Sequence, residues 1–139
     1  MGRKQAREGT MKLIYQMEIN EEYTEEALSL FFENFPFDDS EKDYIRDAYA
    51  KIKNNMETID THIENSLEGW HLNRLAKIDL AILRIALYEI LYREDIPVEV
   101  SINEAIETAK KYSSEDSYKF INGVLGSIVR SMDKDNLWR

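Results

Sequence analysis

A group of cations and one aromatic ring near the start of the chain has the chemistry of an RNA-binding surface. The group consists of Arg3, Lys4, Arg7 and Tyr15, which fall on one side of a helix predicted by the spacing of the apolar residues. Proteins that bind single-stranded RNA combine cations along the backbone with rings on which bases stack, at about 1 to 3 kcal/mol per base. A solvated helix start is the alternative interpretation of these residues.

A second group of this kind lies at the start of the last predicted helix. Asp116, Lys119 and Phe120 follow the pair Ser113 and Ser114. The free N–H groups at a helix N-terminus attract phosphate. Phe120 also has the spacing of a core residue, so its ring is either buried or available to contact RNA.

Motifs of catalysis and metal binding are missing from the sequence. His62 and His71 are nine residues apart, no cysteine is present, and no HExxH, GxSxG or phosphate-binding glycine loop occurs. Neighbouring carboxylates such as Glu21 and Glu22 are expected on solvated helix faces in a chain with 27 acidic residues. We therefore predict no enzyme activity, no metal and no cofactor. A small hydrolase with paired carboxylates is an alternative, for which the sequence specifies no cleft.

Length and composition favour a single acidic domain over residues 1–139. A chain of this size buries roughly 68 to 70% of its unfolded surface and needs no disulfide for stability. The formal charge is −9, with +3 on residues 1–12 and −12 on the remainder. This balance argues against a protein that coats DNA. Because cysteines and a targeting segment are absent, we expect a cytoplasmic protein.

The most apolar stretch covers residues 75–92, and the other helices must pack around it. Its polar residues are Lys77, Asp79, Arg84 and Glu89. These four charges argue against a membrane span, because each costs about 2.5 to 3.5 kcal/mol near a bilayer centre. One stripe of this helix is predicted to meet solvent or a partner, and it consists of Lys77, Ala81, Arg84 and Tyr88.

Helical spacing recurs along the rest of the chain, while no alternating strand pattern persists. A first helix is predicted over residues 4–19. The predicted N-terminal caps of three later helices are Thr24, the pair Ser40 and Asp43, and the pair Ser101 and Glu104.

Breaks between the helices are also marked in the sequence. Pro36 closes the second helix, and Asn54 with Asn55 separates the third helix from a fourth over residues 56–67. Gly69 is the predicted stop of the fourth helix.

Two further glycines, Gly123 and Gly126, fall inside the last helix. Each costs about 1 kcal/mol relative to alanine, which we expect close contact with another helix to offset. Taken together, the patterns predict an all-α bundle of about seven helices, with three packed beside four.

Short sequence words recur in order toward the C-terminus. They are ILR at 82–84, ALYE at 86–89, DIP at 95–97, INEAIE at 102–107, AK at 109–110 and FINGVL at 120–125. With the opening words ARE at 6–8 and LIY at 13–15, this pattern closely resembles the NusB family of bacterial transcription antitermination factors. The resemblance extends over nearly the full length, and residues 20–70 are the least diagnostic.

The resemblance implies an all-α fold of two helical subdomains without catalysis. It implies binding of the boxA element of nascent RNA together with NusE, a ribosomal small-subunit protein. In the family this assembly helps RNA polymerase to read through terminators, notably in ribosomal RNA operons.

The resemblance also implies roles for individual residues. The arginine-rich first helix and its tyrosine meet RNA in the family, which corresponds here to Lys4, Arg7 and Tyr15, with Arg3 beside them. The RNA-contacting positions before the Asn-Gly pair fall on Asp116, Lys119 and Phe120. Helices around the apolar centre supply the NusE surface, so Asp79 and Arg84 are candidate partner contacts. Arg84 is alternatively structural, through Tyr88 or Glu89.

The N-terminus has fewer arginines than that of some family members. Each phosphate contact contributes a salt slope of about −0.7 on single strands, so we predict weak RNA binding by the protein alone and a need for NusE.

Three other interpretations remain open. The same helical module resembles the N-terminal domain of the RsmB ribosomal RNA methyltransferases, although no glycine-rich loop of a cofactor domain follows here. A helical adaptor that binds only proteins predicts that charge reversal at Arg7 leaves RNA binding unchanged. A homodimer that hides the RNA face is the third.

Overall fold

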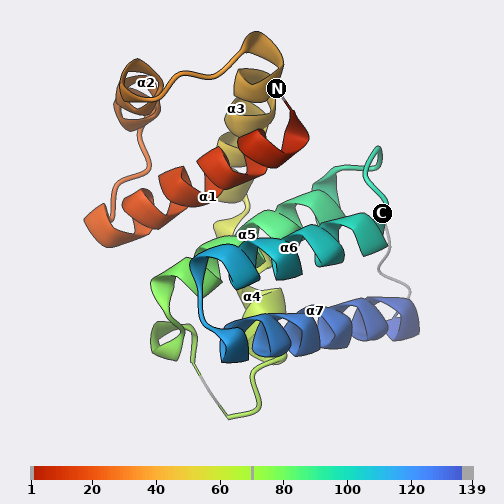
Figure 1. Cartoon of the computed structure of the whole chain (residues 1–139). Helices are drawn as coiled ribbons and strands as arrows, with labels where there is room; N and C mark the ends of the chain where they lie inside the picture. The colour runs from red at the N-terminus through yellow and green to blue at the C-terminus, as the bar shows by residue number, and fades with distance from the viewer. Residues whose placement is uncertain (1, 70, 136–139) are drawn as a thin grey trace.

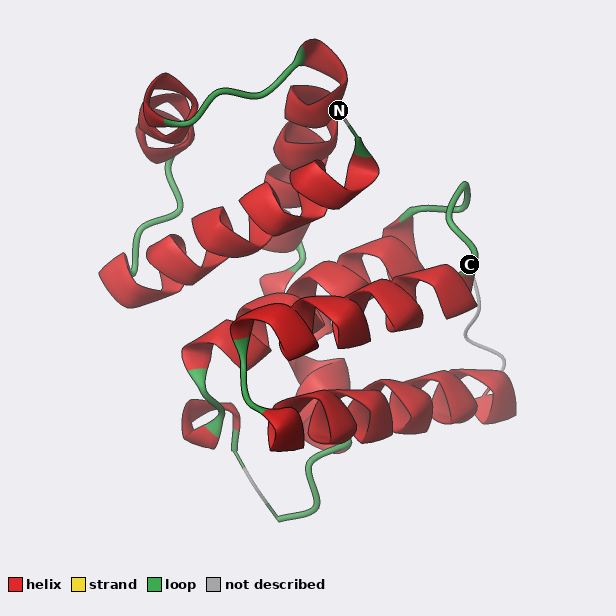
Figure 2. Ribbon diagram, viewed as in Figure 1, coloured by secondary structure: helices red, strands yellow, loops and turns green. Residues whose placement is uncertain are grey.

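Seven α-helices and one short 3₁₀ helix make up the computed structural model, which describes residues 2–69 and 71–135, with side chains as far as residue 133. Their bounds are α1 Arg3–Asn20, α2 Glu25–Asn34, α3 Asp39–Asn54, α4 Met56–Asn65, η1 Leu72–Arg74, α5 Lys77–Tyr92, α6 Val98–Tyr112 and α7 Glu115–Asp135. No strand occurs in this part of the chain (Figure 2). The prediction of an all-α fold with about seven helices is confirmed.

The helices form two groups that meet along α5. Helices α1 to α3 lie in one group and α4 to α7 in the other (Figure 1). Helix α5 packs against α1 and α3 on one side and against α6 on the other. Residues 79–90 of α5 are all buried, so this helix contributes to the core of both groups. Within the described residues, no helix is long and apolar enough to cross a membrane.

The predicted solvent-facing stripe of α5 is wrong for three of its four residues. Lys77 is exposed, whereas Ala81, Arg84 and Tyr88 are buried. The Tyr88 hydroxyl donates to the carboxylate of Asp47 on α3, and Arg84 forms ion pairs with α1 and α4. Buried polar groups are tolerated when they are paired. Neighbouring helices therefore cover a stripe whose polarity suggested solvent.

The predicted boundaries of α2 and α3 are largely confirmed. The Thr24 hydroxyl accepts a hydrogen bond from the Ala27 N–H at 3.1 Å, as an N-cap should. Helix α2 ends at Asn34, before Pro36, and α3 ends at Asn54.

The predicted cap of α3 by Ser40 and Asp43 is wrong. The helix begins two residues earlier, and a capping box joins Asp38 to Glu41. The Asp38 carboxylate accepts from the Glu41 N–H at 2.8 Å, and the Glu41 carboxylate accepts from the Asp38 N–H at 2.9 Å. These two reciprocal bonds satisfy free N–H groups at the start of α3.

The predicted cap of α6 by Ser101 and Glu104 is also wrong. This helix begins at Val98 directly after Pro97, where the N–H that proline lacks would have no partner in the helix. Ser101 is inside the helix, and its hydroxyl donates to the Glu89 carboxylate at 2.7 Å. Ser101, a residue type that is common at helix caps, here joins α6 to α5 instead.

The predictions for Gly69, Gly123 and Gly126 are wrong. Helix α4 ends at Asn65, and Gly69, with φ +76°, lies in the loop beyond it instead of at the cap. A Cβ added at Gly123 would meet no atom within 4 Å, so no close helix contact requires this glycine. A Cβ at Gly126 would approach only the Arg130 side chain, at 3.2 Å.

A glycine in α1 does mark a close approach. A Cβ added at Gly9 would lie 2.5 Å from the Phe37 ring, which is closer than van der Waals contact permits. The segment between α2 and α3 therefore rests directly on the backbone of α1.

Candidate nucleic-acid and partner interface

The first turn of α1 presents Arg3 and Lys4 to solvent. The N-cap residue Gly2 donates its N–H to the Glu41 carboxylate at 3.0 Å, so the start of α3 holds this end of α1. The Arg3 guanidinium carbon lies 5.1 Å from the centre of the Tyr44 ring, a cation–π distance. Lys4 is exposed in the same turn.

Arg7 is drawn into the protein, unlike these neighbours. Its Nε donates to Glu89 Oε2 at 2.7 Å and its Nη2 donates to Glu89 Oε1 at 3.2 Å, which leaves the side chain 10% exposed. Burial by itself lowers the pKa of Arg7, but the hydrogen bonds and charge of Glu89 outweigh burial and place the pKa above its ordinary value. Most of the guanidinium is therefore engaged inside the protein.

The Glu89 carboxylate joins four helices. It accepts hydrogen bonds from Arg7 on α1, from the Tyr44 hydroxyl on α3 and from the Ser101 hydroxyl on α6. The Glu89 side chain is only 1% exposed. Burial, followed by the charge of Glu89, holds the pKa of Tyr44 well above its usual range. We call Glu89 with Arg7, Tyr44 and Ser101 the Glu89 cluster.

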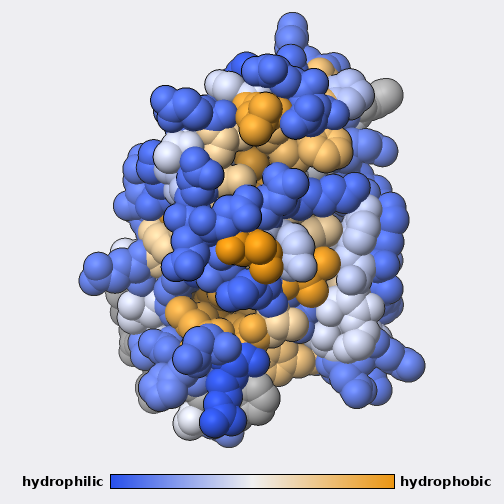
Figure 3. All heavy atoms as spheres, turned by 90° about the vertical axis from the view of Figure 1, so that its left-hand side faces the viewer, coloured by the Kyte–Doolittle hydropathy of each residue, from blue (hydrophilic) through white to orange (hydrophobic). Residues whose placement is uncertain are grey.

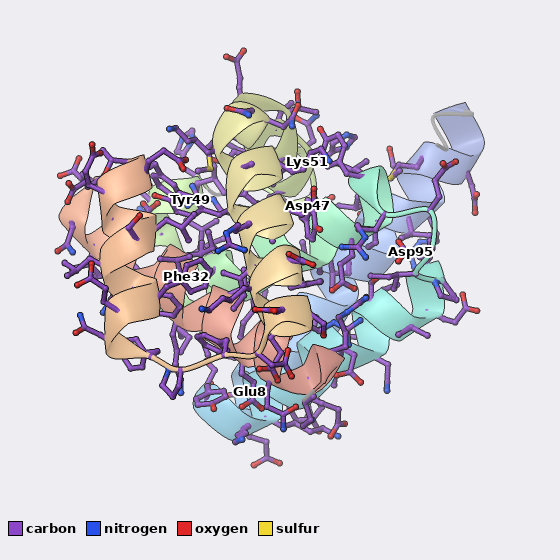
Figure 4. All side chains as sticks on the ribbon, turned by 90° about the horizontal axis from the view of Figure 1, so that it is seen from above. Glu8, Phe32, Asp47, Tyr49, Lys51 and Asp95 are labelled. Atoms are coloured by element: carbon purple, nitrogen blue, oxygen red, sulfur yellow. The ribbon has the colours of Figure 1, made fainter. Side chains whose placement is uncertain are left out.

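The middle of α1 is joined to the end of α6. Glu8 accepts from the Lys111 ammonium at 3.1 Å and from the Tyr112 hydroxyl at 3.0 Å. Lys12 Nζ lies 5.6 Å and Lys111 Nζ 5.2 Å from the centre of the Tyr112 ring. Figure 4 labels Glu8 where these two helices meet. Tyr15, one turn beyond Lys12 along α1, is 38% exposed.

Asp79 fixes the turn between α6 and α7. Its carboxylate accepts from the Ser113 hydroxyl at 2.8 Å and from the Ser117 hydroxyl at 3.0 Å. Ser114 accepts from the Ser117 N–H at 3.1 Å, which satisfies one free N–H at the start of α7. Asp79 itself is buried. The candidate partner contact thus positions the candidate RNA contacts that follow it in the chain.

The first turns of α7 present Asp116 and Lys119 to solvent and leave Phe120 half-buried. The Phe120 ring packs against the core and also lines two hollows. One hollow of about 360 Å³ includes Lys119, and the other, of about 300 Å³, includes Arg74 and Asp116. The Phe120 ring is therefore partly in the core and partly at the surface, and its contact with RNA stays a prediction.

Arg84 is anchored within the protein. Its Nε and Nη2 donate to the two carboxylate oxygens of Asp60 at 2.9 and 2.8 Å, and its Nη1 donates to Glu18 at 2.6 Å. The side chain is 6% exposed. Burial by itself lowers the pKa of Arg84, but the hydrogen bonds to Asp60 and Glu18 and the charge of Asp60 together outweigh burial and raise the pKa. The prediction that Arg84 acts structurally through Tyr88 or Glu89 named the wrong partners. The partners are Asp60 on α4 and Glu18 on α1.

The structure connects the two predicted RNA groups through α6. The end of α6 contacts Glu8 of α1 through Lys111 and Tyr112, and α7 begins three residues after α6 ends. Sequence analysis missed Lys111, Tyr112 and Arg74 as candidate contacts. The adjacent letters KKY at 110–112 combine cations with a ring, and that signal was available.

Figure 3 views the side where α2, the end of α1, the end of α6 and the start of α7 lie, and apolar patches alternate there with polar side chains. Such alternation suits a ligand that offers both bases and phosphates. The roles of the predicted RNA and partner residues stay predictions.

Neither histidine lines the two hollows beside Phe120. His71 Nδ1 is 3.4 Å from the Glu64 carboxylate, and His62 is half-buried. Across residues 2–69 and 71–133, no group of three or more His, Asp or Glu side chains is arranged to hold a metal ion.

We compared the chain with known proteins to find its relatives. The model of the NusB family matches residues 4–130. The transcription antitermination protein NusB of Acetivibrio thermocellus is 48% identical over 130 residues, covering 94% of this chain and 90% of the relative. NusB of Clostridium novyi is 49% identical over 133 residues, covering 94% of this chain and all of the relative.

Solved structures agree with the sequence matches. NusB of T. maritima superposes with a TM-score of 0.86 at 40% identity, covering 94% of this chain and 92% of that one. A crystal structure of the antitermination factors NusB and NusE in complex with dsRNA gives a TM-score of 0.82 at 25% identity, covering 93% and 96%. The fold is that of the all-α antitermination factors with which it superposes. The chain belongs to the NusB family.

Proposed function

We propose that this protein is a transcription antitermination factor that binds boxA RNA together with NusE. The observation that carries the proposal is the family match over residues 4–130. The similarity to NusB in the complex with NusE and dsRNA supports both partners. In the proposed role, the assembly joins an RNA polymerase complex and helps it to read through terminators.

The proposed RNA path follows the exposed side chains. It begins at Lys4, passes Lys12 and Tyr15, crosses the end of α6 and reaches Lys119 and Phe120. The cations along it would track phosphates, and the rings would stack on bases. Asp116 at the N-terminal turn of α7 would accept hydrogen bonds from base or sugar groups.

Arg7 enters the proposal chiefly as a positioning residue. Its ion pair with Glu89 fixes the first turns of α1, and only a small part of the guanidinium faces solvent. In the same way, Asp79 and Arg84 would hold the elements of the NusE surface in place instead of contacting NusE with their charged groups. Both carboxylate oxygens of Asp79 and most donors of Arg84 are already engaged.

The test is fluorescence-anisotropy binding of a short boxA RNA and a scrambled RNA, with and without NusE. We expect a preference for boxA that grows with NusE and is lost in a variant with Lys4→Ala, Lys119→Ala and Phe120→Ala. The matched control carries Lys53→Ala, Arg46→Ala and Phe32→Ala, which change the same residue classes on α2 and α3.

Two results would count against the proposal. A wild-type protein that ignores RNA even with NusE present would favour the protein-binding adaptor. Isolated protein that binds boxA as tightly as the NusE pair does would contradict the predicted need for NusE. Sedimentation of the free protein in the same buffer shows whether a homodimer covers the RNA face.

A further inference from the structure

A groove lies between the second half of α1 and helix α2. It has a volume of about 310 Å³, and Met17, Leu30, Phe31 and Phe35 form its apolar lining. Leu30 is 57% exposed and Phe35 is 40% exposed. Large apolar side chains with so much exposed surface lose free energy to water unless a partner covers them.

The charged residues that line this groove are both acidic. Residues 13–41 contain nine carboxylates and no lysine or arginine, so this segment carries the whole formal charge of −9 and the rest of the chain is balanced. Glu22 and Glu26 lie on the rim of the groove itself, and Glu26 is exposed in the first turn of α2. A ligand that fits must therefore bring positive charge together with apolar groups.

Helix α2 is attached to α3 by side chains on the side away from the groove. Phe32 points toward α3, with Lys42 Nζ 5.6 Å and the Arg46 guanidinium carbon 5.1 Å from its ring centre. The Tyr49 hydroxyl of α3 donates to the Thr24 carbonyl at 2.8 Å. Figure 4 shows Phe32 and Tyr49 between α2 and α3. In Figure 1 no helix of the described part of the chain covers the outer side of α2, and Leu30 of this helix is exposed.

The floor of the groove is rigid as well as apolar. The Phe31 ring lies 4.9 Å from that of Phe35 and 5.8 Å from that of Phe37, centre to centre. Phe37 in turn rests against Gly9 of α1. A preformed aromatic floor reduces the ordering cost of binding.

We propose that this groove is a docking site for a basic amphipathic segment of a partner protein. Apolar side chains of that segment would cover Leu30 and Phe35, and its lysines or arginines would pair with Glu22 and Glu26. The rim also carries the side-chain amide of Asn34, which offers hydrogen bonds to the backbone of the segment. The charge disfavours RNA here, so this site is separate from the proposed RNA path.

The test is an NMR titration of the ¹⁵N-labelled protein with a twelve-residue peptide of lysines and leucines, its leucines spaced to share one helix face. A peptide of the same composition with scattered leucines is the control. The side-chain amides of Gln16, Asn20 and Asn34 line the groove and report binding directly. We expect saturable shifts of these signals with the amphipathic peptide and at least about tenfold weaker binding of the scattered one.

Variants separate the groove from general charge attraction. Leu30→Asp, and the pair Glu22→Lys with Glu26→Lys, should each weaken the peptide by about tenfold or more. The pair Glu57→Lys with Glu99→Lys changes the total charge equally on exposed positions of α4 and α6, and should leave most of the affinity in place.

Three outcomes would overturn the proposal. They are equal binding of both peptides with shifts spread over the acidic surface, groove shifts that grow with protein concentration alone, and groove shifts caused by boxA RNA. The second would assign the groove to another copy of this chain, and the third to nucleic acid.

Discussion

The Glu89 cluster and the first turns of α7 each combine a cation, a carboxylate and an aromatic ring, but the cluster is buried and the first turns of α7 face solvent. In the cluster, a guanidinium, a phenol and a hydroxyl converge on one carboxylate that is 1% exposed. In the first turns of α7, Lys119 and Asp116 face water and Phe120 borders two hollows. A charged side chain in the first region therefore stabilises the protein, whereas one in the second remains available to a ligand.

The largest expected effect comes from removing the centre of the cluster. Glu89→Ala removes the main partner of the buried Arg7 charge, which keeps Glu104 Oε1 at 3.5 Å from its Nη1. Breaking a buried ion pair costs about 3 to 5 kcal/mol of unfolding free energy. Urea unfolding followed by circular dichroism measures the change, with Glu99→Ala on the exposed side of α6 as the control. A loss below about 1 kcal/mol would mean that this cluster behaves like an ordinary surface ion pair.

Phe120→Leu should separate the two roles of its ring. Leucine keeps apolar contact with the core, so the unfolding free energy should fall by less than about 1.5 kcal/mol. The loss of a stacking ring should weaken boxA binding in the presence of NusE by about 1 to 3 kcal/mol. Anisotropy and urea unfolding give the two numbers. Phe32→Leu on α2 should leave RNA binding unchanged, and equal RNA losses in both variants would argue against stacking on Phe120.

The smallest expected change in stability comes from replacing Gly123 or Gly9 by alanine, and its sign should differ between the two. Gly123→Ala places a methyl group in open space beside the Phe120 hollow, so the helix should gain about 1 kcal/mol of stability. Gly9→Ala forces the Phe37 ring away from α1 and should lower stability instead. Thermal unfolding of both variants measures the difference. A gain in both would show that the packing of Phe37 on α1 is looser than the structure indicates.

Local signals in the sequence predicted the elements well. Apolar spacing identified α1 and α5, Thr24 was correctly taken as a cap, and Asn54 with Asn55 was correctly taken as a break. These features depend on neighbours within one or two turns. The cap prediction at Ser40 failed because the choice between Asp38 and Ser40 depends on how the chain enters the helix. The cap prediction at Ser101 failed because Pro97 starts α6 one turn earlier.

The sequence identified residue types suited to an RNA surface, but it identified only in part which of these side chains are exposed. Lys4, Lys119 and Asp116 are exposed as an RNA surface needs, but Arg7 and Arg84 are nearly covered by partners distant in sequence. Glu89 is 82 residues from Arg7 and Glu18 is 66 residues from Arg84. No local pattern reports such pairings.

The sequence by itself determined that the chain is helical, that α5 is central and that the protein belongs among the NusB-like factors. Periodic apolar residues and ordered sequence words suffice for these conclusions. Only the tertiary structure decided which charges are available to a ligand, because burial depends on which helices meet. It also decided that α2 leaves an acidic apolar groove open, since the same phenylalanines could have closed a core around that face.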